Sequence, residues 1–317
     1  MDTDLPQRTR TYRNHHLDSR RWDLYTSQPG DIVVSTAYKA GTTWTQAIVL
    51  TLLDPRGPEI ANVSDRSPWP DRRFGQDEQC LRAMFDARVP GRAMCLKTHL
   101  PLDGLPYHPE LLYIVVGRDP RDVFMSLYNH YNNYNELLFS HLNDDGCVGP
   151  PLPPCPADPR ELWRQWITRG SFEWESEGWP FWGNLAHTRS YWAYRHLPNL
   201  LFVHYGEMYA DPQREIARIA QFIGVDANED LIEDVARRTG FDAMKRNADK
   251  IQARMNNTWR GGAKAFFHAG GGGRWRGILT GKDLTLYAQA KARELTPECA
   301  HWLEAGGRVT GGAVLSS

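Results

Sequence analysis

A lysine and a glycine follow an apolar stretch in the segment STAYKAGTTWTQ, residues 35–46. Gly41 lets the backbone come close to a ligand, and residues 42–44 after it would open a helix whose first N–H groups are free to donate. The helix dipole adds roughly half a positive charge there, and Lys39 adds a full one. The turn is therefore predicted to bind a phosphate-like anion. An ordinary turn with a surface lysine is the alternative.

This turn is not the usual phosphate loop of nucleoside triphosphatases. That motif, GxxxxGK[ST], places its lysine directly after the second glycine, whereas Lys39 stands two residues before Gly41. The rest of the chain must therefore indicate which anion is bound.

A second candidate anion site follows another apolar run, in VVGRDPRDVFMSLY at residues 115–128. Arg118 stands at the junction of the expected strand and helix, and Ser126 lies eight residues further along. Ligands of open α/β sheets gather at the carboxyl ends of strands, so both sites could face one nucleotide. The alternative is that Arg118 only pairs with Asp119 or Asp122 and caps the helix.

A run of four glycines lies in FFHAGGGGRWRG, residues 266–277. The N–H groups of such a backbone can surround an anion, with Arg274 and Arg276 beside it. A flexible surface loop is the alternative.

The elements that must position these residues alternate between strands and helices. Apolar runs predict strands at 31–36, 93–99, 111–117 and 199–206, and helical patterns are found at about 43–53, 122–134, 184–197 and 211–224. The last helix has Asp211 as its expected N-cap, Pro212 at its first position and Gly224 at its end. Nearly continuous apolar strands between helices indicate an α/β fold with a central parallel sheet flanked by helices.

Composition narrows the class of protein. The chain has 317 residues, 41% of them hydrophobic and 24% charged, and its formal net charge is −1. This charge excludes a global field that attracts nucleic acid. The apolar runs are too short for a transmembrane segment, and five scattered cysteines are typical of reduced thiols. We expect a cytoplasmic protein, and the spacing of histidines, cysteines and carboxylates indicates no metal site.

One segment interrupts the alternating pattern. Residues 143–160 are rich in proline and glycine, and we interpret residues 132–184 as an insertion on the substrate side of a single domain, 1–317. Its tryptophans could line an apolar or sugar-binding groove or pack the insertion onto the body; they are Trp163, Trp166, Trp174, Trp179 and Trp182. Glu173, Glu175 and Glu177 alternate, as on a solvated strand face.

Together these segments resemble the cytosolic-type sulfotransferases, in particular bacterial members, which use 3′-phosphoadenosine 5′-phosphosulfate (PAPS). The matches, in chain order, are residues 37–44 with Tyr-Pro-Lys-Ser-Gly-Thr-Thr-Trp, 97–101 with Lys-Thr-His-Leu-Pro, 118–126 with Arg-(Asn/Asp)-Pro-(Lys/Arg)-Asp-x-x-x-Ser, 205–208 with Tyr-Glu-Asp-Met, 239–245 with Thr-Ser-Phe-x-x-Met-Lys, and 268–276 with Arg-Lys-Gly-x-x-Gly-x-Trp-Lys. The resemblance implies the P-loop-like fold shared by sulfotransferases and nucleotide kinases, and transfer of a sulfuryl group from PAPS, with 3′,5′-ADP as product.

The resemblance also implies roles for single residues. His99 would take the proton of the acceptor hydroxyl, although a lone histidine is more often a hydrogen-bonded core residue. Lys39 would stabilise the bridging oxygen of the leaving group, and Lys97 would assist near the transferring group. Arg118 and Ser126 would bind the 3′-phosphate, and Ser126 would also hold Lys39 before substrate binds.

The remaining cofactor-binding positions implied by the resemblance surround the phosphosulfate, the adenine and the 3′-phosphate. They are Ala40, Gly41, Thr42, Thr43, Trp44, Tyr205, Thr239, Phe241, Met244, His268, Ala269 and Gly270. Trp44 or Phe241 offers a stacking face for the base.

The chain departs from the family pattern at three places. His268 and Ala269 stand where the family has Arg-Lys, so both cations for the 3′-phosphate are absent and Arg274 or Arg276 would have to compensate. Gly240 replaces a serine. The family's C-terminal dimerisation pattern is poorly matched, so the oligomeric state stays open.

The acceptor substrate is the part of the function that the sequence determines least. A phenol, a sterol-like alcohol, a glycolipid and the hydroxyl of an antibiotic or other secondary metabolite all fit the sequence. A P-loop kinase-like phosphotransferase is the second interpretation, although it would need Mg²⁺ ligands and a lysine inside GxxxxGK[ST]. A non-catalytic nucleotide- or lipid-binding relative is the third.

Overall fold

The computed structural model describes residues 5–57, 63–253, 255–267 and 270–309. Its centre is a four-stranded sheet in the order β2-β1-β3-β4 with every pair parallel. The strands are β1 (Ile32–Thr36), β2 (Cys95–Thr98), β3 (Leu112–Gly117) and β4 (Leu200–His204). The predicted strands and the parallel sheet are confirmed.

The prediction for β4 was too long at its end. The strand was expected to reach residue 206, but helix α8 (Tyr205–Ala210) begins directly after His204. The His204 side chain accepts the N–H of Gly206 and so caps this helix. A side chain that satisfies a free helical donor thus ends the strand two residues earlier than the apolar pattern indicates and starts a short helix that was not predicted.

Strand register brings the predicted loops to one edge of the sheet. Ser35 pairs with Thr98 of β2, and Thr36 pairs with Val116 of β3. The backbones that follow β1, β2 and β3 therefore leave the sheet side by side, at its carboxyl edge.

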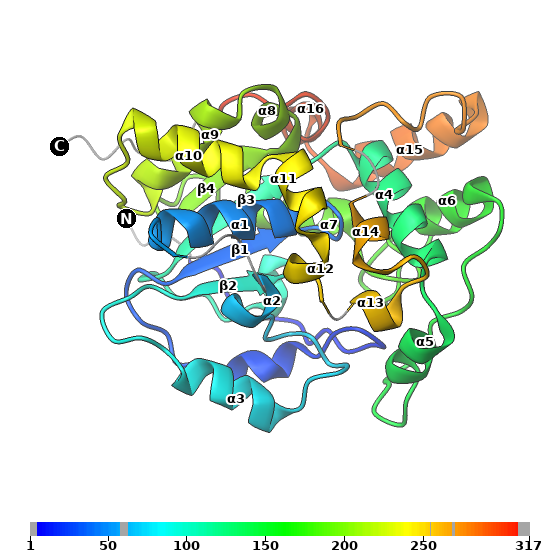
Figure 1. Cartoon of the computed structure of the whole chain (residues 1–317). Helices are drawn as coiled ribbons and strands as arrows, with labels where there is room; N and C mark the ends of the chain where they lie inside the picture. Colours follow the sequence, from blue (N-terminus) through cyan, green and yellow to red (C-terminus); the bar gives the residue numbers. More distant parts are fainter. Residues whose placement is uncertain (1–4, 58–62, 254, 268–269, 310–317) are drawn as a thin grey trace.

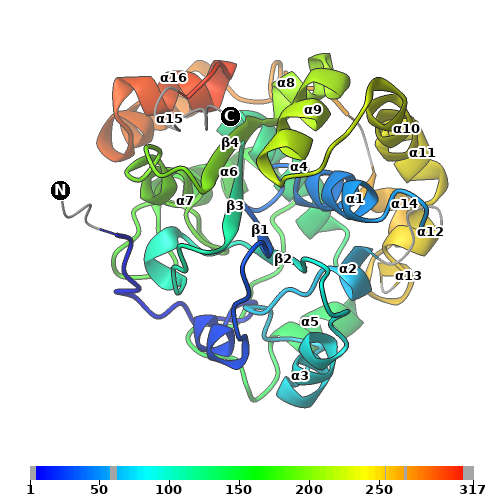
Figure 2. The same ribbon diagram turned by 90° about the vertical axis from the view of Figure 1, so that its left-hand side faces the viewer.

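Helices cover both faces of the sheet. Alternate strand residues such as Ile32 and Ile114 pack against helices α1 (Thr42–Leu53), α9 (Pro212–Phe222) and α10 (Glu229–Thr239). Their neighbours Val33 and Tyr113 face the core that contains α4 (Pro120–Asn132), α6 (Pro159–Thr168), α7 (Asn184–Trp192) and α16 (Pro297–Ala305). In Figure 2, α1 and α10 lie to the right of the strands and α7 lies to their left.

The four predicted helices are present with shifted ends. α4 begins two residues before its predicted start, because Asp119 caps it and Pro120 occupies the first position. α7 ends at Trp192 and not near residue 197. α9 follows the prediction closely: Asp211 accepts the N–H of Arg214, and Gly224 has φ +72° just after the end.

A layer of short helices lies beyond the carboxyl edge of the sheet. It consists of α11 (Phe241–Arg246), α12 (Ala248–Ile251), α13 (Met255–Thr258) and α14 (Gly262–Phe266). Figure 1 shows them on the same side of the molecule as α5 (Glu136–Leu142). A bridge between Tyr134 and Trp259 joins the two groups. The other elements are η1 (Ser19–Leu24), α2 (Val63–Arg66), α3 (Glu78–Asp86), η2 (Leu102–Gly104) and α15 (Gly281–Glu294).

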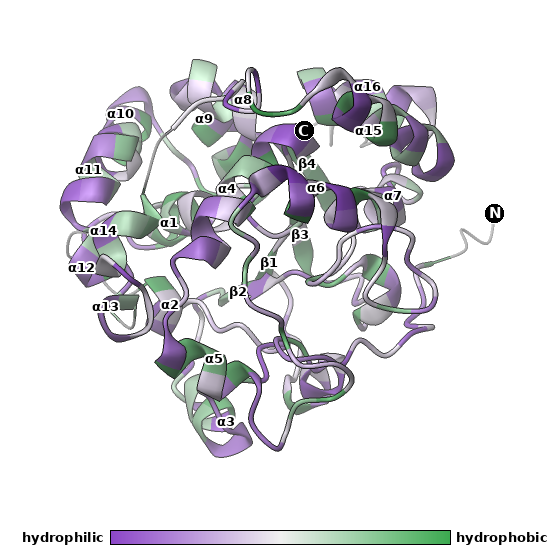
Figure 3. Cartoon of the chain, turned by 90° about the vertical axis from the view of Figure 1, so that its right-hand side faces the viewer, coloured by the Kyte–Doolittle hydropathy of each residue, from purple (hydrophilic) through white to green (hydrophobic). Residues whose placement is uncertain are grey.

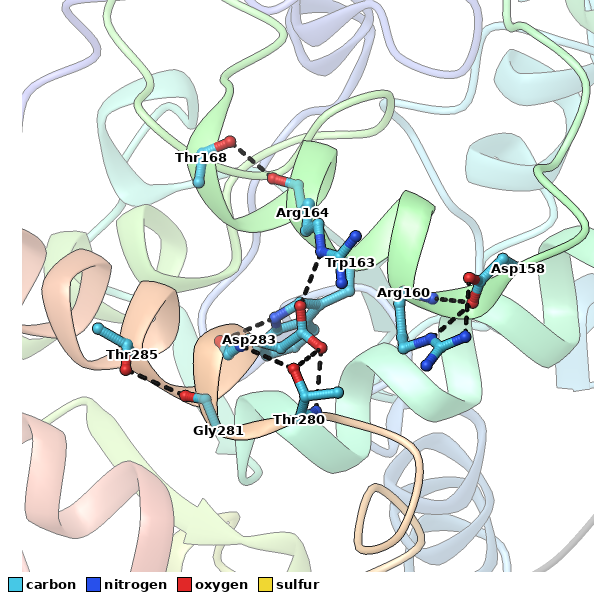
Figure 4. Close-up of polar contacts among 9 residues, drawn as sticks. All are labelled: Asp158, Arg160, Trp163, Arg164, Thr168, Thr280, Gly281, Asp283 and Thr285. Carbon is cyan, nitrogen blue, oxygen red and sulfur yellow. Dashed lines mark hydrogen bonds and ion pairs between the residues drawn. The ribbon is translucent and has the colours of Figure 1, made fainter.

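The insertion at 132–184 is packed into the body of the protein. Trp163 of α6 donates from Nε1 to the carbonyl oxygen of Asp283 at 3.0 Å, and Arg164 Nε lies 2.8 Å from the Asp283 carboxylate (Figure 4). The same carboxylate accepts from Thr280, which caps α15. Trp163, Trp166 and Trp182 are buried in the core that also contains strand residues. These three tryptophans therefore pack the insertion onto the body.

The expected solvated face of Glu173, Glu175 and Glu177 is wrong for two of its three members. Glu177 is fully buried, and Glu175 is 9% exposed. The Glu177 carboxylate accepts the N–H groups of residues 184–186 at 3.0–3.1 Å, and Glu175 accepts that of Gly183 at 3.0 Å. These are the unpaired donors at the start of α7, so the alternation reflects two helix-capping carboxylates. Burial nevertheless raises the pKa of Glu177 to about 7.

Hydrophobic residues are concentrated on the strands in the middle of the molecule, and the outer helices mix polar and apolar residues (Figure 3). Within the described ranges, no helix is both long and apolar enough to cross a bilayer.

Replacing Glu177 tests its role as the cap of α7. We expect Glu177→Ala to lower the free energy of unfolding by about 3 kcal/mol, because buried N–H groups lose their acceptor. Glu177→Gln keeps one oxygen and should lose about half as much. Urea unfolding measures both. Glu173→Ala, at an exposed site, is the control and should change stability by less than about 0.5 kcal/mol. Equal losses for Glu177→Ala and Glu173→Ala would contradict the capping role.

Candidate active site

A cavity of about 580 Å³ opens at the carboxyl edge of the sheet. Most of the residues singled out in the sequence line it, and these are Lys39, Gly41, Thr42, Thr43, Trp44, Lys97, His99, Arg118, Ser126, Tyr205, Thr239, Phe241 and Met244. Ala40 belongs to the same loop as Lys39 and Gly41, and its side chain is buried. His268 and Ala269 lie outside the described residues. The structure thus brings together residues from five separate segments of the chain.

The loop from Ala37 to Gly41 has a strained backbone. Lys39 has φ +70°, which is uncommon for a residue with a side chain, and Gly41 has φ +118°. A Cβ atom at Gly41 would lie 2.9 Å from the Tyr205 ring, so only glycine fits. Such strain is found where a loop is shaped for binding, which agrees with the predicted anion site.

The side chain of Lys39 is held by a histidine. Lys39 Nζ lies 3.3 Å from His130 Nδ1 and 3.9 Å from the centre of the Phe266 ring. Across the described part of the chain, no hydrogen bond joins Lys39 to Ser126, which was expected to hold it. His130 lies one helical turn beyond Ser126 on α4, and in this structure it is the residue that contacts the amine.

Three cations meet at the cavity, and no carboxylate of the described residues forms an ion pair with them. Burial lowers the pKa of Lys39 well below its usual value, and the charges of Lys97 and Arg118 lower it further. Burial also lowers the pKa of Lys97 to about 7. The nearby Asp71 carboxylate is occupied by the indole N–H groups of Trp22 and Trp69, at 3.0 and 2.7 Å. Uncompensated buried cations favour an anionic ligand.

Arg118 joins two loops. Its guanidinium donates to the carbonyl oxygens of Lys39 and Gly271, at 3.2 and 3.0 Å, and lies over the Tyr205 ring at 4.0 Å. Asp119, its sequence neighbour, pairs instead with Arg121. The alternative that Arg118 only pairs with an adjacent aspartate is therefore wrong. Its Nε is buried and has no partner among the described residues.

The loop of four glycines, residues 270–273, already binds an anion of the protein itself, the carboxylate of Asp122. The N–H of Gly273 donates to Asp122 at 2.7 Å, and the N–H of Arg274 donates to it at 3.2 Å. A Cβ atom at Gly272 would lie 2.7 Å from this carboxylate, so the contact requires glycine. The hypothesis that these two N–H groups hold an external anion is wrong, and the loop is neither free nor detached from α4. Gly270 packs against Tyr209 and Phe241.

His99 presents one unpaired nitrogen. Its Nδ1 lies 2.8 Å from the carbonyl oxygen of Thr36. A carbonyl only accepts, so Nδ1 carries the proton and Nε2 carries the lone pair. Nε2 is buried without a partner in the described ranges. Burial, with the charge of Lys97 second, lowers the pKa of His99 well below its usual value, so the ring is neutral and able to accept a proton. It is not a fully satisfied core histidine.

The other half of the cavity is largely aromatic. It is lined by Trp69, Phe74, Trp259 and Phe266, with the polar residues Arg72, His141 and Asn257 and the leucines Leu137 and Leu138. Leu137 is 45% exposed at this end. The tryptophans of the insertion are not among the lining residues of the described chain, and the insertion contributes Leu137, Leu138 and His141 of α5 instead. No sequence signal linked these residues, because they come from separate parts of the chain.

Comparison with known proteins gives one consistent family. The family model of the sulfotransferase domain matches residues 29–295. A glycolipid sulfotransferase of Mycobacterium bovis (strain BCG) is 31% identical over 325 residues, covering 97% of this chain and 98% of that protein. The glycolipid sulfotransferase of Mycobacterium tuberculosis (strain H37Ra) is also 31% identical, with the same coverage.

Solved structures agree on the fold. Retinol dehydratase, in a complex with androsterone and the inactive cofactor PAP, superposes with a TM-score of 0.66. The two chains are 21% identical, and the match covers 88% of this chain and 84% of the other. This likeness confirms the P-loop-like α/β fold.

The buried Lys97 should make the stability of the protein depend on pH. Below about pH 7 both the folded and the unfolded state hold its proton, so the cost of burying the charge is complete. Between that pH and the ordinary value of 10.5, only the unfolded state keeps the proton, and the cost falls as pH rises. We therefore expect Lys97→Met to stabilise the protein most near neutral pH and progressively less toward pH 10.

Urea unfolding at about pH 7 and about pH 9.5 checks this expectation. Lys282→Met, at an exposed position, is the control and should show no comparable pH dependence. A stabilisation by Lys97→Met that is constant or grows with pH would mean that Lys97 is charged in the folded protein throughout this range.

Proposed function

The chain belongs to the sulfotransferase family, and from that premise we propose that it transfers a sulfuryl group from PAPS to a hydroxyl of an amphipathic lipid, with a glycolipid as the class of acceptor. The observation that carries the proposal is the continuity of one cavity. It joins a cationic loop, suited to a phosphosulfate, to a neutral histidine whose lone pair has no partner among the described residues.

The nucleotide half of the cavity has groups that fit PAPS. Trp44 and Tyr205 meet edge to face at 5.6 Å, and Phe241 lies nearby on the cavity wall, so aromatic faces are available to the adenine. Trp44 Nε1 and Arg118 Nε are buried without partners in the described chain, as expected of donors that a ligand completes. The helix N-terminus at residues 42–44 and Lys39 suit the phosphosulfate.

In the proposed reaction the acceptor oxygen forms a bond to sulfur while the bond from sulfur to the bridging phosphate oxygen breaks. The hydroxyl proton passes to Nε2 of His99, and the Thr36 carbonyl oxygen, which accepts the Nδ1–H, stabilises the imidazolium that forms. Negative charge develops on the bridging oxygen. Lys39 neutralises it, and Lys97 adds positive charge to the same region.

The acceptor half of the cavity supports an amphipathic substrate. Aromatic faces and exposed Leu137 suit an apolar body, while Arg72, His141 and Asn257 can bind hydroxyl groups. The two mycobacterial relatives named above are glycolipid sulfotransferases, and the chain matches nearly their whole length. Among the acceptors that fit the sequence, the glycolipid is the one that both observations favour.

The first test is transfer itself. The protein with PAPS and a glycolipid should yield a sulfated glycolipid and 3′,5′-ADP, which mass spectrometry detects. Activity should persist in EDTA, whereas a kinase-like phosphotransferase would require ATP and lose activity when its metal is removed.

We expect His99→Ala to lower kcat by about 10³-fold, typical for loss of a general base, with affinity for 3′,5′-ADP nearly unchanged. Unchanged turnover, or a large loss of nucleotide affinity, would contradict the role of His99.

A matched pair of variants tests how the 3′-phosphate is bound. Arg274 is close enough to Arg118 to lower its pKa, and its N–H is fixed by Asp122, whereas Arg276 is exposed beside Trp275. By isothermal titration we expect wild type to bind 3′,5′-ADP more tightly than 5′-AMP. Arg274→Ala should reduce this preference by about tenfold, and Arg276→Ala should leave it unchanged. Equal effects of the two variants would show that Arg274 has no special place at the phosphate.

A further inference from the structure

A continuous line of hydrogen bonds runs from the active-site lysine into the protein. Lys39 Nζ lies 3.3 Å from His130 Nδ1, and His130 Nε2 lies 2.9 Å from the hydroxyl of Tyr38. The Tyr38 hydroxyl is in turn 3.2 Å from that of Tyr134. His130 and Tyr134 are buried, with 4% and 1% of their surfaces exposed. The first half of the line therefore connects α4 to the loop from Ala37 to Gly41.

The second half ends on the backbone of the insertion. The Tyr134 hydroxyl lies 3.4 Å from His16 Nε2, and the two Nδ1 atoms of His16 and His15 are 2.5 Å apart. His15 Nε2 lies 2.8 Å from the carbonyl oxygen of Pro180. Both histidines are buried, and burial lowers the pKa of each, so both rings are neutral.

The carbonyl at the end determines the direction of every hydrogen bond in the line. A carbonyl only accepts, so His15 donates from Nε2 to Pro180 and accepts at Nδ1. His16 must then donate from Nδ1 and accept at Nε2, which the hydroxyl of Tyr134 supplies. The Tyr134 oxygen is left as an acceptor for the next member.

The same assignment of donors and acceptors extends from Tyr134 to Lys39. Tyr38 donates its proton to Tyr134, so the Tyr38 oxygen accepts from His130 Nε2. His130 is neutral, because burial lowers its pKa, with the charge of Lys39 as the next cause. With its proton on Nε2, its Nδ1 carries the lone pair and can only accept an N–H of Lys39.

We propose that this line, from Pro180 to Tyr38, makes His130 a positioning residue for Lys39 by fixing the ring nitrogen that faces the amine as an acceptor. The inference rests on the proposed function, in which Lys39 neutralises the leaving group. A neutral acceptor orients the amine without cancelling its charge, whereas a carboxylate at the same place would form an ion pair and weaken its attraction for the phosphosulfate.

Two tyrosines of the same region allow a matched test. Tyr134→Phe breaks the line, after which the Tyr38 proton turns to His130 Nε2 and the His130 proton moves to Nδ1, facing Lys39. Tyr131→Phe removes another buried hydroxyl, which bonds the carbonyl oxygen of Pro153 outside the line. Tyr134→Phe loses the hydrogen bonds to His16 and from Tyr38, and Tyr131→Phe loses the one to Pro153, so thermal unfolding should show Tyr134→Phe as the somewhat less stable of the two.

We expect Tyr134→Phe to lower kcat by about tenfold with the KM for PAPS changed less than about twofold, and Tyr131→Phe to keep wild-type kcat. Nitrogen-15 spectra of the histidine rings should show His130 protonated at Nε2 in wild type and at Nδ1 in Tyr134→Phe. Assignment comes from the signal lost in a His130 variant. Equal kcat for the two tyrosine variants, or a wild-type ring protonated at Nδ1, would overturn the proposal.

Conservative replacement of His130 separates the acceptor from the packing of its ring. His130→Asn places an oxygen near the position of Nδ1 and should retain kcat within about threefold, whereas His130→Phe keeps a ring but should lose about tenfold. An asparagine variant that folds but is as slow as the phenylalanine variant would overturn the proposal. Failure of wild type to transfer sulfuryl groups would refute the proposed function instead, because the ring spectra are read without turnover.

Discussion

Three desolvated cations at the carboxyl edge of one parallel sheet are the constraint on which the rest of the site depends. Lys39, Lys97 and Arg118 are desolvated and lack a carboxylate partner among the described residues. This arrangement costs folding free energy, and an anionic ligand can recover it on binding. The nearby carboxylates are occupied elsewhere: Asp71 accepts indole N–H groups and Asp122 accepts backbone N–H groups.

Neutral acceptors orient the groups that react in the proposed mechanism. The carbonyl oxygen of Thr36 accepts the proton of one nitrogen of His99, and the other nitrogen has no partner in the part of the chain that the structure describes. In the proposed line of hydrogen bonds, His130 contacts Lys39 through a ring whose proton lies on the far side. In both cases a neutral polar group sets the position of the side chain, so the positive charges of the site are not cancelled and stay available to the substrate.

The insertion supports the site from beneath. Its buried tryptophans and its two capping glutamates anchor it to the core, and its Pro180 carbonyl terminates the line of hydrogen bonds that reaches His130. The acceptor half of the cavity is built by α5, which belongs to the insertion, by α13 and α14, and by residues after α2. The tryptophans of the insertion are therefore structural, and the insertion reaches the cavity wall through α5, which has no tryptophan.

The sequence alone determined the sheet and the binding loops, because apolar strands, a glycine beside a lysine and a capped helix are local signals of backbone conformation. Residues such as Lys39, His99 and Arg118 were predicted to meet, since the carboxyl ends of parallel strands share one edge. The tertiary structure decided the contacts between distant segments: His130 on Lys39, Asp122 on the glycine loop, and the burial of Glu177. An alternating or isolated polar residue gives the same sequence pattern whether its side chain faces water or a buried donor. Only the packing of the folded chain distinguishes these two environments.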